Sequence, residues 1–105
     1  MRFTLLAALL SAQIAAAAPD IKLPAGTRQD GDHYVSGRGL RDSTDAIAKE
    51  LAKRGIAVEQ IGPTRIRSVE LTRFISQQPS TAWLAIHVIR SAGKTLIFFV
   101  PRPKP

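Results

Sequence analysis

Residues 82–100, AWLAIHVIRSAGKTLIFFV, are the stretch of sequence that decides the fold. Apolar, aromatic and β-branched side chains fill 82–90 and 94–100, a composition typical of β-strands. Ser91-Ala92-Gly93 lies between these two runs and favours a turn. The stretch therefore predicts a β-hairpin, which Pro101 ends.

Both faces of this hairpin are apolar in sequence. Because side chains alternate along a strand, we expect one face to carry Leu84, Ile86 and Val88. The opposite face of the same strand carries Trp83, Ala85, His87 and Ile89. The second strand divides in the same way, with Phe98 on one side and Phe99 on the other.

One helix covers only one face of a sheet. We therefore expect the second face to be covered by the segment that precedes the domain, by another copy of the chain, or by a partner or lipid. The candidate interface residues on the hairpin are Trp83, His87, Ile89 and Phe99.

Upstream of the hairpin, residues 43–54 predict a short amphipathic helix. Asp42 or Ser43 can cap its first turn, and Gly55 is a natural end. Its apolar positions follow helical spacing and are Ala46, Ile47, Ala48, Leu51 and Ala52. Since this stripe is mostly alanine, the helix should lie close against a sheet.

The remaining strands are shorter or less distinct. Residues 33–36 can form a short strand, and 56–61 alternate like a strand that Gly62-Pro63 ends. Residues 65–75 fit either a helix or a strand, and their β-branched and aromatic content favours the strand. The fold class is therefore α+β, with one short amphipathic helix packed on an antiparallel meander of three to five strands.

Three arginines belong to the ambiguous segment. If residues 65–75 are one strand, Arg65, Arg67 and Arg73 share a face and form a basic stripe, which makes them further candidate interface residues. The same face would carry Val69 and Leu71, so the stripe can equally be arginine stems packed around a core.

The N-terminus predicts export. Residues 1–17 combine Arg2, a short apolar run and small residues at the end, which is the pattern of a secretory signal peptide. Residues 18–32 then form an extended lead segment, 33–101 a single domain, and 102–105 a basic, proline-rich tail. We expect a periplasmic or secreted protein without a transmembrane segment after cleavage, and the sequence of 105 residues contains no cysteine for a lipid anchor or disulfide.

The charge of the chain favours anionic partners. Lys and Arg number 15 against 8 Asp and Glu, a net charge of +7. The expected compartment argues against nucleic acid as the physiological partner. Phosphorylated lipids, lipopolysaccharide, acidic glycans or an acidic protein fit better, and a homodimer is also possible.

The most suggestive local motif is Gly37-Arg38-Gly39-Leu40-Arg41-Asp42, just before the predicted helix. Glycines let backbone amides approach a ligand, and a helix start offers unpaired N–H groups. Gly37, Arg38, Gly39 and Arg41 are therefore candidate anion-binding residues. An ordinary turn with solvated arginines is the competing interpretation.

No catalytic, metal or cofactor site is predicted. Asp30-Gly31-Asp32-His33 lacks the further ligands of a calcium or zinc site and fits an exposed acidic turn. His87 and His33 have no recognisable catalytic partner.

The leading hypothesis is an exported, non-enzymatic binding or accessory domain that contacts an envelope protein or anionic envelope component through an arginine-rich surface. The alternatives are a secreted inhibitor or immunity-type protein and, with no support in the sequence, a small hydrolase.

Overall fold

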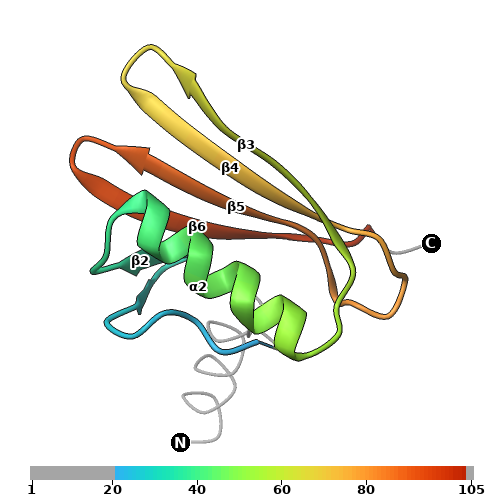
Figure 1. The fold of residues 1–105 in the computed structure, drawn as a ribbon. Helices are drawn as coiled ribbons and strands as arrows, with labels where there is room; N and C mark the ends of the chain where they lie inside the picture. Colours follow the sequence, from blue (N-terminus) through green and yellow to red (C-terminus); the bar gives the residue numbers. More distant parts are fainter. Residues whose placement is uncertain (1–20, 104–105) are drawn as a thin grey trace, which may run out of the picture.

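A single antiparallel sheet carries one helix in the computed structural model, which describes residues 21–103 (Figure 1). The elements in chain order are β1 (Arg28–Asp30), β2 (His33–Ser36), α2 (Leu40–Lys53), β3 (Val58–Ile66), β4 (Val69–Ser76), β5 (Trp83–Ser91) and β6 (Lys94–Pro101). The strand order is β1-β2-β6-β5-β4-β3. The predicted α+β class is confirmed, but the sheet has six strands rather than three to five. The predicted signal peptide, residues 1–17, lies outside the described residues.

The hairpin at residues 82–100 forms β5 and β6. His87 pairs with Phe98 in the middle of this ladder, and Ser91 pairs with Lys94 at its end. Ala92 and Gly93 form the turn with positive φ angles of 52° and 76°. Two positive φ angles match the right-handed twist of the flanking strands, as in type I′ turns.

The helix α2 begins three residues before the predicted start. Leu40 lies about one turn before Thr44 and two turns before Ile47 on the buried side, so its burial extends the helix toward the N-terminus. Gly39 takes the N-cap position and no side chain caps the first turn. Ser43 is not a cap: it is fully buried, and its hydroxyl lies 2.7 Å from that of Ser36.

The part of the lead segment that the structure describes, residues 21–32, is part of the fold rather than an extended segment before it. It contributes β1, which pairs with β2 through Gln29 and Tyr34. Ile21 is 5% exposed and belongs to the core, and Leu23 packs against it. The strand β1 was not predicted, because it has only three residues and the prolines and glycines around it favour a loop.

The segment after the helix is a hairpin of two strands. Gly62-Pro63 does not end β3 but forms an irregularity between Ile61 and Thr64, beyond which pairing with β4 resumes. The turn falls at Arg67 and Ser68, inside the 65–75 segment for which a single strand was predicted. Arg67 takes a left-handed φ of 57°. This conformation is uncommon for residues other than glycine, so an arginine gives no sign of it in the sequence.

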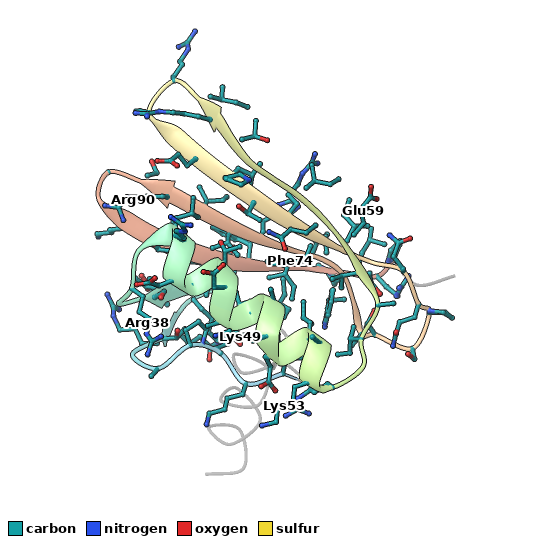
Figure 2. All side chains as sticks on the ribbon, viewed as in Figure 1. Arg38, Lys49, Lys53, Glu59, Phe74 and Arg90 are labelled. Carbon is teal, nitrogen blue, oxygen red and sulfur yellow. The ribbon has the colours of Figure 1, made fainter. Side chains whose placement is uncertain are left out.

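The two faces of the sheet differ in what lies on them. The face toward α2, here called the covered face, holds the core side chains Tyr34, Phe74, Trp83, Ile86, Val88 and Ile97. Figure 2 shows Phe74 pointing toward the helix, whose Ile47 and Leu51 are at most 1% exposed. The residues of the other face, here called the open face, are half-buried or more exposed apart from Ala85.

Candidate functional site

The turn between β2 and α2 is held rigidly in place. The amide of Gly37 donates to the carbonyl oxygen of Gly26 at 3.2 Å, and the amide of Arg38 donates to the Ser36 hydroxyl at 3.1 Å. The Ser36 hydroxyl in turn meets that of Ser43 in the helix. These contacts fix the backbone of the predicted anion cradle before any ligand arrives.

The first turn of α2 has backbone amides without a side-chain cap. No side chain caps it, although the Ser43 amide already bonds to the Gly39 carbonyl oxygen at 3.0 Å. The preceding amides of the first turn carry the positive end of the helix dipole and have no acceptor within the helix. Asp42 is the acidic residue of this first turn.

Arg90 brings a third guanidinium to this turn. It lies at the end of β5, and a Cβ built on Gly39 would lie 3.8 Å from Arg90 Nη1. Figure 2 shows Arg38 and Arg90 at the end of the molecule where α2 begins. Arg38 and Arg41 are exposed there. We call Arg38, Arg41 and Arg90, with Gly37 and Gly39, the arginine turn.

None of these three arginines is neutralised by an ion pair within residues 21–103. The ion pairs in that part of the chain join His33 to Asp30 and Asp32, and Arg54 to Glu50. The sequence did not point to Arg90 as a member of the site. The one sequence feature that could have indicated it is its position next to the predicted hairpin turn, because the end of a strand can lie beside the start of a helix.

A cleft of about 390 Å³ opens on the other side of Arg41, between the first half of α2 and strands β3 and β4. Its lining residues are Leu40, Arg41, Thr44, Asp45, Gln60, Pro63, Glu70 and Thr72. Asp45 and Glu70 give this cleft both signs of charge. Glu70 also lies opposite Arg90 in the pairing of β4 with β5, so this carboxylate borders the arginine turn as well as the cleft.

The predicted basic stripe is wrong. Arg65 pairs with Glu70 and faces the helix side, whereas Arg73 pairs with His87 on the open face. Arg67 lies in the turn between β3 and β4. The turn reverses the chain between the first and last of these arginines, so the period-2 argument across 65–75 does not apply.

The candidate interface residues of the hairpin are also divided. His87 and Ile89 lie on the open face, as predicted. Trp83 is 3% exposed and lies in the core, because a register irregularity between Trp83 and Ala85 shifts its alternation. Phe99 points to the covered face, where its ring meets that of Trp83 edge to face at 6.3 Å.

The two histidines occupy different surroundings. His33 stacks on Phe98 at 4.9 Å, and its Nδ1 lies 3.0 Å from Asp32 Oδ1. This hydrogen bond lowers the pKa of the Asp32 carboxyl. Burial, and to a smaller extent the charge of Arg73, lower the pKa of His87. Within residues 21–103 no cluster of three or more His, Cys, Asp or Glu could hold a metal ion.

The tail that follows β6 is partly structural. Arg102 donates to the carbonyl oxygens of Thr81 and Gln78 and to the Ser76 hydroxyl. It thereby holds the loop between β4 and β5, and is not a free basic group.

Comparison with known protein families, with curated proteins and with solved structures finds no match to this chain. In residues 21–103 no helix is long and apolar enough to cross a bilayer.

Proposed function

We propose that this protein is a non-enzymatic binding module for an anionic component of the cell envelope, and that the arginine turn is its contact site. The observation that carries this proposal is the approach of Arg90 to Gly39 between two further arginines. Guanidinium groups and free helix amides are the donors that phosphate and carboxylate groups prefer. The predicted export of the chain would place these donors opposite phospholipid headgroups, lipopolysaccharide or acidic glycans.

A site of this kind differs from general attraction by charge. With a net charge of +7 the chain attracts any polyanion at low salt. A specific site requires that these three arginines matter more than three others. The chain offers a matched control in three exposed basic residues outside the arginine turn: Figure 2 shows Lys49 and Lys53 further along α2, and Arg67 lies in the turn between β3 and β4.

The test is co-sedimentation with phosphatidylglycerol vesicles, and with phosphatidylcholine vesicles as the neutral reference, at about 50 and about 300 mM NaCl. R38A/R41A/R90A should weaken binding to anionic vesicles roughly 30-fold, since three charge-assisted contacts are lost. K49A/K53A/R67A should weaken it only a few-fold. Equal losses in the two triple variants would reduce the site to net charge alone.

The alternative of a secreted inhibitor uses the same arginine turn against an acidic enzyme cleft. It predicts no preference for anionic over neutral vesicles at about 300 mM NaCl. A protective effect of the protein against a hydrolase, lost in R38A/R41A/R90A, would favour that function instead.

A further inference from the structure

The cleft between α2 and strands β3 and β4 adjoins the arginine turn, and the two share a residue. Arg41 belongs to the arginine turn and also lines the cleft. On the sheet, Glu70 lines the cleft and lies opposite Arg90 of the arginine turn in the pairing of β4 with β5. A ligand held at the arginine turn can therefore extend into the cleft.

Two carboxylates line this cleft without a cationic partner in the described part of the chain. Asp45 lies on α2, one turn after Arg41, and the half-buried Glu70 lies on β4. The ion pairs of residues 21–103 include neither carboxylate. Because they stay unpaired beside arginines, in a chain with a net charge of +7, both carboxylates are available to a cation from outside the chain.

Two buried hydroxyl groups of the same cleft also lack a partner. Of the four buried hydroxyls that have no hydrogen bond within residues 21–103, two are the Oγ1 atoms of Thr44 and Thr72. Thr44 is 6% exposed and Thr72 is 1% exposed, and both residues line the cleft. Buried polar groups in folded proteins are nearly always hydrogen-bonded, so these hydroxyls indicate that a polar group enters the cleft.

The cationic and anionic groups of this combined site are separated by a short distance. On α2, Asp45 follows Arg41 by about 6 Å along the helix axis. On the sheet, Glu70 and Arg90 are paired residues of neighbouring strands, whose backbones lie about 5 Å apart. A ligand that satisfies both kinds of group must carry an anion and a cation about 5 Å apart, a distance that four single bonds of about 1.5 Å span.

Resting on the proposed function, we infer that the ligand of the arginine turn is an aminoalkyl phosphate, a phosphate ester whose alkyl group ends in a primary ammonium. The phosphate accepts hydrogen bonds from the guanidinium groups of the arginine turn and from the free amides at the start of α2. The ammonium donates hydrogen bonds to Asp45 and Glu70. An ester oxygen and two carbon atoms between phosphorus and nitrogen give the four bonds that the spacing requires.

The cleft selects a primary ammonium over a quaternary one. A primary ammonium has three N–H donors, enough for the two carboxylates and for one of the hydroxyls of Thr44 and Thr72. A trimethylammonium group has no N–H donor, so it would leave the carboxylates and both hydroxyls of the cleft without hydrogen bonds.

The first test is isothermal titration calorimetry at about 50 mM NaCl on the protein purified after expression of the full chain. The probes are O-phosphoethanolamine, inorganic phosphate and phosphocholine. Phosphoethanolamine should bind about tenfold more tightly than inorganic phosphate, since its ammonium adds charge-assisted hydrogen bonds. Phosphocholine has the same spacing but no N–H donor, and should bind no more tightly than inorganic phosphate. Equal dissociation constants for phosphoethanolamine and inorganic phosphate would overturn the assignment.

Substitution of the carboxylates tests which residues recognise the ammonium. Asp45→Asn and Glu70→Gln should each lower the preference for phosphoethanolamine over inorganic phosphate about threefold, and D45N/E70Q should abolish it. The preference is the ratio of two affinities, so it removes the general effect of a lost negative charge on anion binding. A tenfold preference that survives in D45N/E70Q would exclude the cleft from the site.

Glu59→Gln is the matched control for the two carboxylate variants. Glu59 is exposed, and Figure 2 shows it on the side of β3 away from α2. Its substitution removes the same charge and should leave the preference for phosphoethanolamine unchanged. Circular dichroism checks that each variant remains folded.

Thr72→Val distinguishes a hydroxyl that binds the ligand from one that supports the fold. The variant replaces an unpartnered hydroxyl by a methyl group at nearly the same shape, so the free protein should unfold at the same or a higher temperature. The affinity for phosphoethanolamine should fall several-fold, while the affinity for inorganic phosphate stays the same. A lower unfolding temperature with unchanged affinities would assign the hydroxyl to the fold and overturn the extension of the site into the cleft.

Failure of the arginine turn and failure of ammonium recognition give different results. If R38A/R41A/R90A binds inorganic phosphate as the wild type does, the arginine turn is not the anion site, and its ligand assignment falls with it. If this variant loses phosphate binding but the wild type shows no preference for phosphoethanolamine, the proposed function stands and the aminoalkyl class is wrong.

Vesicles identify the source of the aminoalkyl phosphate. If the source is a lipid headgroup, the wild type should sediment with vesicles of phosphatidylethanolamine in phosphatidylcholine, and D45N/E70Q should not. Binding of phosphoethanolamine without sedimentation of the protein would identify a free aminoalkyl phosphate as the ligand.

Discussion

The covered and open faces of the sheet carry similar numbers of apolar side chains, but in residues 21–103 the helix packs only on the covered face. On the covered face Phe74, Ile86 and Val88 are completely buried beneath α2. On the open face Leu96, Phe98 and Ile89 are only half-buried. The difference shows that strand composition measures how much apolar surface a chain offers, whereas the partner elements decide how much of it is removed from water.

The largest test of this comparison replaces one phenylalanine on each face. Phe74→Ala should lower the free energy of unfolding by about 3–5 kcal/mol, because it opens a cavity in a closed core. Phe98→Ala should cost about 1 kcal/mol, since its ring is already partly in water. Urea unfolding measures both losses. Equal losses would mean that the open face is closed in solution.

Gly62 lies at the irregularity of β3, after which the alternation of side chains between the two faces shifts by one residue. Gly62 has a φ of 109°, and a Cβ there would lie 2.6 Å from the Leu71 carbonyl oxygen. Gly62→Ala should therefore cost about 2–3 kcal/mol through backbone strain and displacement of β4.

Gly55→Ala is the matched control for Gly62→Ala. Gly55 also has a positive φ, 68°, but nothing lies within 4 Å of the built Cβ. The cost should be about 1 kcal/mol, from the left-handed conformation alone. The same urea titration compares the two variants, and an equal cost at both positions would exclude the steric contribution at Gly62.

Arg102 and Arg73 allow a comparison between a guanidinium group that donates hydrogen bonds within the chain and one that has no ion pair within residues 21–103. Arg102→Ala removes hydrogen bonds to the Gln78 and Thr81 carbonyl oxygens and should cost about 1–3 kcal/mol. Arg73→Ala should change the free energy of unfolding by less than about 0.5 kcal/mol, because no ion pair within residues 21–103 is lost. Thermal unfolding of both variants at low concentration checks this order. A larger loss for Arg73→Ala would reveal a partner for this side chain within the chain.

The smallest expected effect is a pH dependence from the open face. The pKa of His87 is lowered from 6.5 in the folded chain, so the unfolded chain binds the proton more readily. Stability from this group is complete above pH 6.5 and falls as the pH drops from 6.5 toward the lower folded pKa. His87→Gln should flatten this part of the profile, measured as the urea midpoint between pH 8 and pH 5. An unchanged slope would assign the dependence to other groups.

Much of the fold could be predicted from periodicity. The β5–β6 hairpin, the helix, its position on one face and the apolar second face all follow from the spacing of Ile86, Val88, Ile97 and their neighbours. The turn at Arg67 could not be predicted, because it lacks the glycine or asparagine that usually marks a left-handed residue. The position of Trp83 depended on an irregularity that leaves no mark in the local sequence.

The candidate site was only half visible in the sequence. Gly37, Arg38, Gly39 and Arg41 are adjacent in the chain, and the motif points to a helix start. Arg90 is 49 residues further along the chain than Arg41. It joins the turn only because β5 ends beside the start of α2, a consequence of strand order that spacing alone does not reveal.

The two edges of the sheet bear on the risk of aggregation. β1 has only three residues, and β3 is interrupted at Gly62-Pro63, where proline offers no amide for a ladder. Arg65 follows on the same edge, and Arg67 lies in the turn beyond it. Edges of this kind resist strand-by-strand growth into fibrils. A chain rich in β-structure can thus expose a broad apolar sheet face and still be directed toward assemblies of finite size.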